Sequence, residues 1–203
     1  MSIVILGNAK HLINLADHKG LTEEACDDLV QTGLQADLYE AAVVGKLKRV
    51  DRFAFRQLLG LVAKICKIVV DYTMTLEQMV IAGCYDLVDL NITPDLFEVE
   101  GEGQVELEPE LVHFGHDRSS EVVLAELEKR GLRPGTLAEL LAFGATCPEV
   151  QQEFLVVALG SSAEVCGDRR VPFLDGNDSR RVLSLGWFED GWGGNCRFLA
   201  FRK

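Results

Sequence analysis

The fold of this chain can be argued from its C-terminal segment, Leu183–Lys203, which reads LSLGWFEDGWGGNCRFLAFRK. Its final run, Arg197–Phe201, is apolar at successive positions, and successive side chains of a strand point to opposite faces of a sheet. A strand that is apolar on both faces is buried on both faces. We therefore predict that Arg197–Phe201 is built into a sheet.

Composition and charge set limits on the class of protein. The chain has 203 residues, of which 48% are hydrophobic, and a formal net charge of −12. That charge argues against nucleic acid or an anionic membrane as the partner, and no apolar run reaches the roughly 18 residues of a membrane span. The apolar start has no basic region and stops at Gly7-Asn8, so we expect no secretory signal and a cytoplasmic location.

The cysteines show no metal-binding or redox spacing. Six are scattered without a CxxC motif, at positions 26, 66, 84, 147, 166 and 196. In a chain without a secretory signal this pattern predicts reduced, packed thiols. A disulfide between Cys166 and Cys196 is the alternative.

The chain divides into two predicted parts, a helical segment at 1–63 and a second domain at 64–203. Thr22-Glu23-Glu24 is typical of a helix start, and apolar residues follow it at helical spacing. A basic patch lies at Lys46, Lys48, Arg49, Arg52 and Arg56. It is either the solvated face of a helix or an anion or partner site.

Three helices are predicted in the second domain from their capping residues. Thr75 with Gln78, and Thr136 with Glu139, each form a capping box. Ser119 or Ser120 caps the helix between them. Glycines, Gly144 for the last, are expected to end these helices.

Strands are predicted at both ends of this domain. Ile65–Tyr72 is rich in β-branched residues, and Leu96–Val99 with Val105–Leu107 has the alternation of a hairpin. Phe154–Leu159 is expected to be a central strand. A second hairpin is expected from residues 168–174 and 180–185 around a turn at 175–178. Helices beside strand hairpins predict an α+β fold, in which residues 105–114 supply the partner of the last strand.

This arrangement resembles the C-type-lectin-like fold, which lectins, sulfatase-modifying-type domains and the variable proteins of diversity-generating retroelements share. Leu132-Arg133-Pro134-Gly135-Thr136-Leu137 is similar to the turn that opens the family's second helix. Cys196-Arg197-Phe198-Leu199-Ala200 is similar to its final strand, and the tryptophan-bearing loop before that strand matches Trp187 and Trp192. The pattern over roughly 65–203 also resembles a group of small bacterial proteins. The resemblance implies a C-type-lectin-like α+β domain with an antiparallel sheet and two short helices, after an N-terminal helical segment.

The family's calcium motifs, Glu-Pro-Asn and Trp-Asn-Asp, are absent. Without those oxygen ligands there is no basis for a calcium-dependent sugar site. Asp175–Ser179 lacks the bidentate glutamate of a calcium loop and is read as a hairpin turn.

Residues with potential chemistry are few. His113, His116 and Asp117 place two imidazoles and a carboxylate within five residues and could contribute to a metal site. On a strand end, however, the two imidazoles would point to opposite sides, and a further ligand would have to come from elsewhere. Cys196 beside Arg197 could have a lowered pKa, although no base is evident. We therefore assign no catalytic residue, no metal and no cofactor.

The best candidate for a binding site is the tryptophan loop, which we define as residues 187–196. It combines aromatic anchors with polar groups on a glycine-rich backbone, a composition that suits binding surfaces. The alternative is that both tryptophans are core residues under the loop. The candidate ligand-binding residues are Trp187, Phe188, Glu189, Asp190, Trp192 and Asn195.

The leading functional hypothesis is a non-enzymatic module that binds a protein or other macromolecule through this loop. In one version of this hypothesis it is a retroelement-diversified variable protein. A second hypothesis is an assembly protein, a homo-oligomer joined by the helices of residues 21–62. The third is a metal- or thiol-dependent enzyme.

Overall fold

The computed structural model describes residues 37, 40, 43–44, 67–177 and 179–203. The predicted helical segment at 1–63, and its boundary with the second domain, lie outside this part of the chain except for those first few positions. The segment, its boundary and the assembly hypothesis stay predictions.

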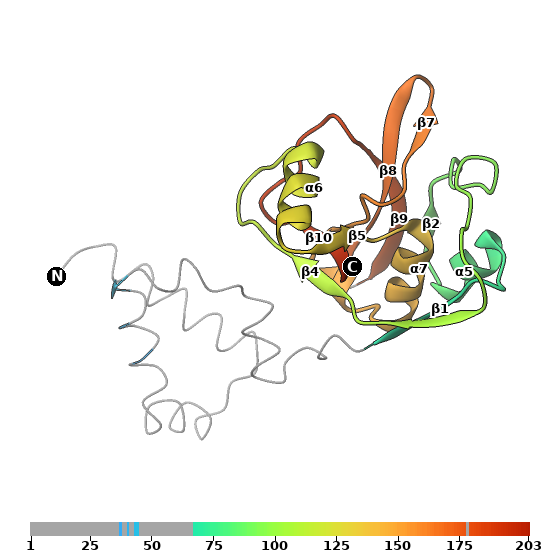
Figure 1. The fold of residues 1–203 in the computed structure, drawn as a ribbon, viewed down its shortest axis with the longest axis horizontal. Helices are drawn as coiled ribbons and strands as arrows, with labels where there is room; N and C mark the ends of the chain where they lie inside the picture. The colour runs from blue at the N-terminus through green and yellow to red at the C-terminus, as the bar shows by residue number, and fades with distance from the viewer. Residues whose placement is uncertain (1–36, 38–39, 41–42, 45–66, 178) are drawn as a thin grey trace. The chain divides into compact units, whose positions relative to one another are not determined.

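Residues 67–203 form both helices and strands, as an α+β class requires (Figure 1). In chain order the elements are β1 (Ile68–Asp71), α5 (Leu76–Ala82), β2 (Leu87–Val88), β3 (Gln104–Leu107), β4 (Glu110–Val112), α6 (Ser120–Lys129), β5 (Leu132–Pro134), α7 (Leu137–Thr146), α8 (Val150–Glu153), β6 (Val156–Val157), β7 (Ala163–Val165), β8 (Asp168–Asn177), β9 (Arg180–Trp187) and β10 (Arg197–Arg202).

The main sheet has the strand order β2-β9-β8-β6-β10-β4, with β5 added to β10 and β7 to β8. We expected an antiparallel sheet, and this expectation is wrong in part because β6 and β10 run parallel, as do β2 and β9. Parallel neighbours need a long connection between them. The chain from β6 supplies one by making β7, β8, β9 and the tryptophan loop before it returns as β10.

Strand β10 lies inside the main sheet and pairs with other strands along both of its edges. On one edge it pairs antiparallel with β4, with Phe198 opposite Val112. Its other edge pairs with β6 along its first residues and with β5 along its last. The predicted pairing of the last strand with the 105–114 segment is thereby confirmed.

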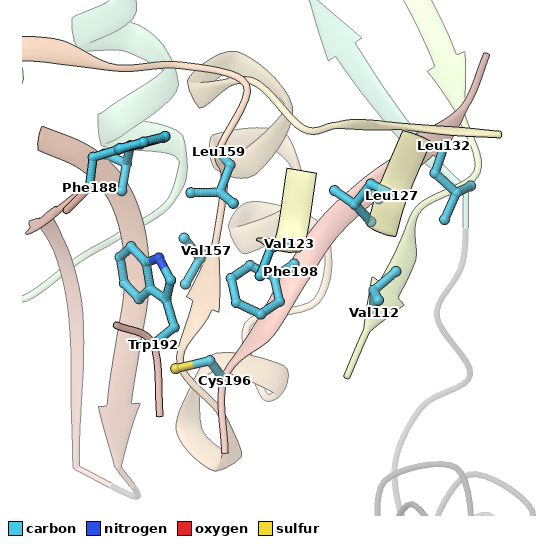
Figure 2. Close-up of a cluster of buried hydrophobic side chains, with 12 residues drawn as sticks. Val112, Val123, Leu127, Leu132, Val157, Leu159, Phe188, Trp192, Cys196 and Phe198 are labelled. Carbon is cyan, nitrogen blue, oxygen red and sulfur yellow. The ribbon is translucent and has the colours of Figure 1, made fainter. Parts of the chain in front are cut away.

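Both faces of β10 are covered, which explains its continuous apolar run. Phe198 and Ala200 belong to the core under α6 (Figure 2). Leu199, on the opposite face, contacts Gly135 just before α7, where an added Cβ would lie 2.9 Å from the leucine side chain. Every residue from Arg197 to Phe201 is buried.

One predicted hairpin is wrong. Residues 96–99 are not a strand: the chain turns at 94–96 and bends at Phe97, where the backbone N–H groups of Leu96 and Phe97 both donate to the carbonyl of Thr93. Strand β3 pairs instead with β1, antiparallel, across a long sequence separation. The apolar side chains of β1, Ile68 and Val70, are fully buried, and this burial outweighs the local alternation.

A polar tie joins the ends of β1 and β3. The Asp71 carboxylate accepts hydrogen bonds from the Thr73 hydroxyl at 2.6 Å, from Gln104 Nε2 at 2.7 Å and from the Thr73 backbone N–H at 3.0 Å. Donors to the ionised form stabilise it. The hydroxyl bond first, and then the other two, hold the pKa of Asp71 below its ordinary value.

The predicted caps are confirmed. Thr75 and Thr136 form capping boxes with Gln78 and Glu139, and Ser119 caps α6. The expected end of α7 at Gly144 is wrong, because the helix continues to Thr146. Gly144 lies inside the helix and lets Tyr85 pack closely against it, since a Cβ at this position would lie 2.3 Å from the Tyr85 hydroxyl.

The second predicted hairpin is confirmed, and it is the longest ladder of the domain. Strands β8 and β9 pair from Arg170–Trp187 to Asn177–Arg180. The predicted central strand is confirmed in position but is shorter than expected, since β6 covers only Val156–Val157. It lies between β8 and β10.

Candidate functional site

The tryptophan loop connects β9 to β10 and passes beside α6 (Figure 1). Its aromatic residues have different fates. Phe188 and Trp192 are buried, at 4% and 7% exposure, whereas Trp187 is 47% exposed. The polar candidates Glu189, Asp190 and Asn195 are exposed.

Phe188 and Trp192 anchor the loop in the core under α6 (Figure 2). The Trp192 ring meets Phe198 of β10 edge-on, with centroids 6.3 Å apart. It also lies against Gly186 of β9, where a Cβ would come within 2.7 Å of the indole. Of the two tryptophans, only Trp192 therefore has the core role that the sequence left open, and Phe188 shares it.

A buried hydroxyl joins the two anchors. Trp192 Nε1 donates to Ser120 Oγ at 2.9 Å, and Ser120 Oγ donates to the carbonyl of Phe188 at 2.6 Å. Ser120 is the first residue of α6 and is fully buried. The start of the helix thus fixes both sides of the loop through one side chain.

The segment before α6 holds the rest of the loop. The backbones of Arg118 and Trp192 exchange hydrogen bonds of 3.0 and 2.8 Å. Further along, His113 Nε2 donates to the carbonyl of Gly194 at 2.8 Å, and the Gly194 N–H donates to Asp117 Oδ1 at 3.1 Å. A Cβ at Gly194 would lie 2.8 Å from the His116 backbone, so the two segments are in close contact.

The histidines are used in these local contacts. Besides the bond from His113, His116 Nδ1 donates to the carbonyl of Phe114 at 2.7 Å. Within the described part of the chain, no group of three His, Cys, Asp or Glu side chains is arranged to hold a metal ion.

Trp187 lies on the outer part of the β8–β9 ladder. Arg170, its partner across the ladder, places its guanidinium carbon 3.9 Å from the centroid of the indole. The indole Nε1 donates to Asp168 Oδ2 at 3.4 Å, and the same carboxylate oxygen lies 3.5 Å from Arg170. The exposed tryptophan is therefore held between a cation and a carboxylate.

The alternative of a disulfide between Cys166 and Cys196 is wrong, because both thiols are free. Burial raises the pKa of Cys196, and the opposing effect of the Arg197 charge is smaller. The suggestion that this thiol has a lowered pKa is wrong.

The hairpin turn is shorter than expected, because residues 175–177 belong to β8 and pair with residues 180–182 of β9. Asn177 Oδ1 accepts hydrogen bonds from the backbone N–H and the hydroxyl of Ser179, both at 3.0 Å. Side-chain acceptors of this kind stabilise turns locally.

One feature that sequence reasoning missed is a basic groove of about 460 Å³ between the 113–118 segment and α6. Its residues come from the end of β4, the loop after it and the exposed side of α6. Each is an ordinary surface residue in sequence, so no local pattern marks the groove.

No family model, curated protein or solved structure matches this chain. Among the described helices, none is long and apolar enough to cross a membrane.

Proposed function

We propose that this chain is a cytoplasmic, non-enzymatic binding module with a C-type-lectin-like domain. Its tryptophan loop binds a protein or other macromolecule through Trp187, Glu189, Asp190 and Asn195. The observation that carries the proposal is the contrast within the loop, in which two aromatic residues are anchored and a third is left 47% exposed.

Anchoring favours binding because an ordered loop loses little conformational entropy when a partner docks. The loop is anchored at Phe188 and Trp192, and at Gly194 it is hydrogen-bonded through both its N–H and its carbonyl. Its exposed rim is therefore presented in one arrangement.

The exposed residues also have the chemistry of a binding surface. Tryptophan and arginine are the residues most enriched at energetic hot spots of interfaces, and here Trp187 and Arg170 are stacked together. Glu189 and Asp190 add negative charge beside this pair. A partner with an apolar pocket rimmed by basic groups would complement this surface.

The fold part of the proposal rests on β10. The resemblance led us to expect that the last strand pairs with the 105–114 segment, and the β10–β4 pair, followed by helices α6 and α7, supports it. The first described strand, β1, pairs with β3 and not with the last strand. The parallel β6–β10 pair is the departure from the expected antiparallel sheet.

The test is binder selection followed by a matched pair of variants. Binders are selected from a displayed peptide library against the full chain, and their affinities are measured for Trp187→Ala and Ile81→Ala. Ile81 is an exposed apolar residue on α5, at 73% exposure, and serves as the control.

We expect Trp187→Ala to weaken the enriched binders about 30-fold, the effect of losing a hot spot of about 2 kcal/mol. The Ile81→Ala variant should leave them unchanged. Binders that keep full affinity for Trp187→Ala would show that the loop is not the preferred surface.

The retroelement version of the proposal makes a separate prediction about sibling genes. Variation should be concentrated at the exposed positions Trp187, Glu189, Asp190 and Asn195, and Phe188 and Trp192 should be kept because they are core residues. Sibling sequences with no excess variation over 187–196 would remove this version and leave the binding proposal intact.

A further inference from the structure

The basic groove beside α6 contrasts with the charge of the whole chain. Its lining contains three permanent cations, Arg118, Lys129 and Arg130, two imidazoles, from His113 and His116, and a single carboxylate, Glu126; the other lining residues are Phe114 and Val122. The chain as a whole has a net charge of −12. Cations gathered in one concave surface create a local field that attracts anions.

The single carboxylate does not neutralise the groove. Glu126 Oε1 accepts from Arg130 Nε at 3.1 Å and from a terminal nitrogen of the same guanidinium at 3.0 Å, and Glu126 lies 3.8 Å from Lys129. These contacts orient Arg130 from α6. Among the described residues, no carboxylate lies within ion-pairing distance of Arg118.

Arg118 is held in place and has donor capacity to spare. Its backbone is fixed by the two hydrogen bonds with Trp192. Its Nε is buried and has no hydrogen-bond partner among the described residues. Because this Nε is out of reach of the groove, a ligand oxygen would accept from the terminal nitrogens of the same guanidinium, which make no hydrogen bond with the described residues.

An aromatic ring positions both guanidinium groups. The guanidinium carbons of Arg118 and Arg130 lie 5.8 and 5.3 Å from the centroid of Phe114. Two arginine forks beside one ring suit an oxyanion with several acceptor oxygens, since guanidinium matches phosphate and carboxylate geometry.

We propose that this groove binds a phosphate monoester through Arg118, with Arg130 and Lys129 supplying further positive charge. A dianion uses the excess of cations better than a single carboxylate does. The volume of about 460 Å³ leaves room for a group attached to the phosphate. This proposal stands independently of what the tryptophan loop binds.

The test is a titration of the full chain with three probes: inorganic phosphate, phenyl phosphate and glutarate. Binding is monitored through the NMR signals of the backbone amides and the histidine rings. Phosphate and phenyl phosphate should give saturable shifts around the groove at up to about 10 mM, enough for a site with a Kd of about 1 mM. Tighter binding of phenyl phosphate would identify a phosphate carried on a larger molecule, and equal binding would identify free phosphate.

Two arginine variants provide the specificity control. Arg118→Gln should weaken phosphate about 10- to 100-fold, as expected for lost hydrogen bonds to a charged group. Arg169→Gln removes the same charge from an arginine that also stacks on an aromatic ring, Phe188, but does not line the groove. It should change binding less than twofold.

Arg118→Lys keeps the charge without the planar fork, and should fall between wild type and Arg118→Gln. Thermal unfolding of each variant checks that the domain is folded. The proposal is overturned if no saturable shift is seen, if both glutamine variants weaken phosphate equally, or if glutarate binds as tightly as phosphate.

Discussion

Removal of the Ser120 hydroxyl tests whether α6 holds the tryptophan loop. In Ser120→Ala, the buried Trp192 Nε1 loses its acceptor and the Phe188 carbonyl loses its donor, bonds of 2.9 and 2.6 Å. Each buried polar group left without a partner costs about 1–3 kcal/mol. We expect the free energy of unfolding to fall by about 2–4 kcal/mol, because the loop can relax in part.

The measurement uses a Trp187→Phe background. The chain has two tryptophans, so in this background Trp192 is the only fluorophore of its kind. Urea unfolding followed by its fluorescence gives the stability, and acrylamide quenching in the folded state reports the exposure of the loop anchor. Ser120→Ala should increase this quenching as well as lower the stability.

The neighbouring serine is the matched control. Ser119 caps α6 through a longer bond, 3.5 Å to the N–H of Val122, and does not contact the loop anchors in any hydrogen bond of the described residues. Ser119→Ala should cost about 0.5–1 kcal/mol without a change in quenching. Equal effects of the two substitutions would refute the role we assign to Ser120.

Three further predictions concern strand β10, the hydrogen bonds of Asp71 between β1 and β3, and the cysteine thiols. Leu199→Ala should lower the free energy of unfolding by about 2–5 kcal/mol, the cost of a cavity at a fully buried leucine; a loss below about 1 kcal/mol in urea unfolding would contradict the central place of β10. The hydrogen-bonded Asp71 has a lowered folded-state pKa, so its contribution to stability is present above the unfolded-state pKa of about 4 and is lost as the pH falls through the folded-state value. Asp71→Asn should make thermal stability less sensitive to acid over this range, and an unchanged pH profile would argue against the tie. In the native protein, iodoacetamide should label the exposed Cys84 and Cys166 well before the buried, raised-pKa Cys196, as followed by peptide mass spectrometry, and early labelling of Cys196 would contradict its burial.

Features that depend on a few neighbouring residues could be predicted from the sequence alone. The capping boxes at Thr75 and Thr136 were predictable because a cap is made within one helical turn. The β8–β9 hairpin was predictable because its two strands follow each other in the sequence and are joined directly by a turn. The burial of Arg197–Phe201 was predictable because only a strand covered on both faces carries a continuous apolar run.

The partner of a strand and the role of a glycine depend on long-range packing and could not be predicted in this way. The alternation around Leu96–Val99 is that of a hairpin arm, yet β3 pairs with β1, whose two buried β-branched residues lie on a strand that packs against α7. A glycine at the position of Gly144 is typical of a helix end, but here it lies inside α7, where the missing Cβ leaves space for the Tyr85 side chain. Both outcomes depend on contacts between residues far apart in the chain.

The same limit applies to the candidate sites. Trp187 and Trp192 are equivalent by composition, and strand alternation together with the Ser120 hydroxyl exposes one and buries the other. The groove around Arg118 exists because the 113–118 segment and α6 meet in space. Sequence patterns determine the elements of this protein, whereas its surfaces depend on long-range packing that has no local signature.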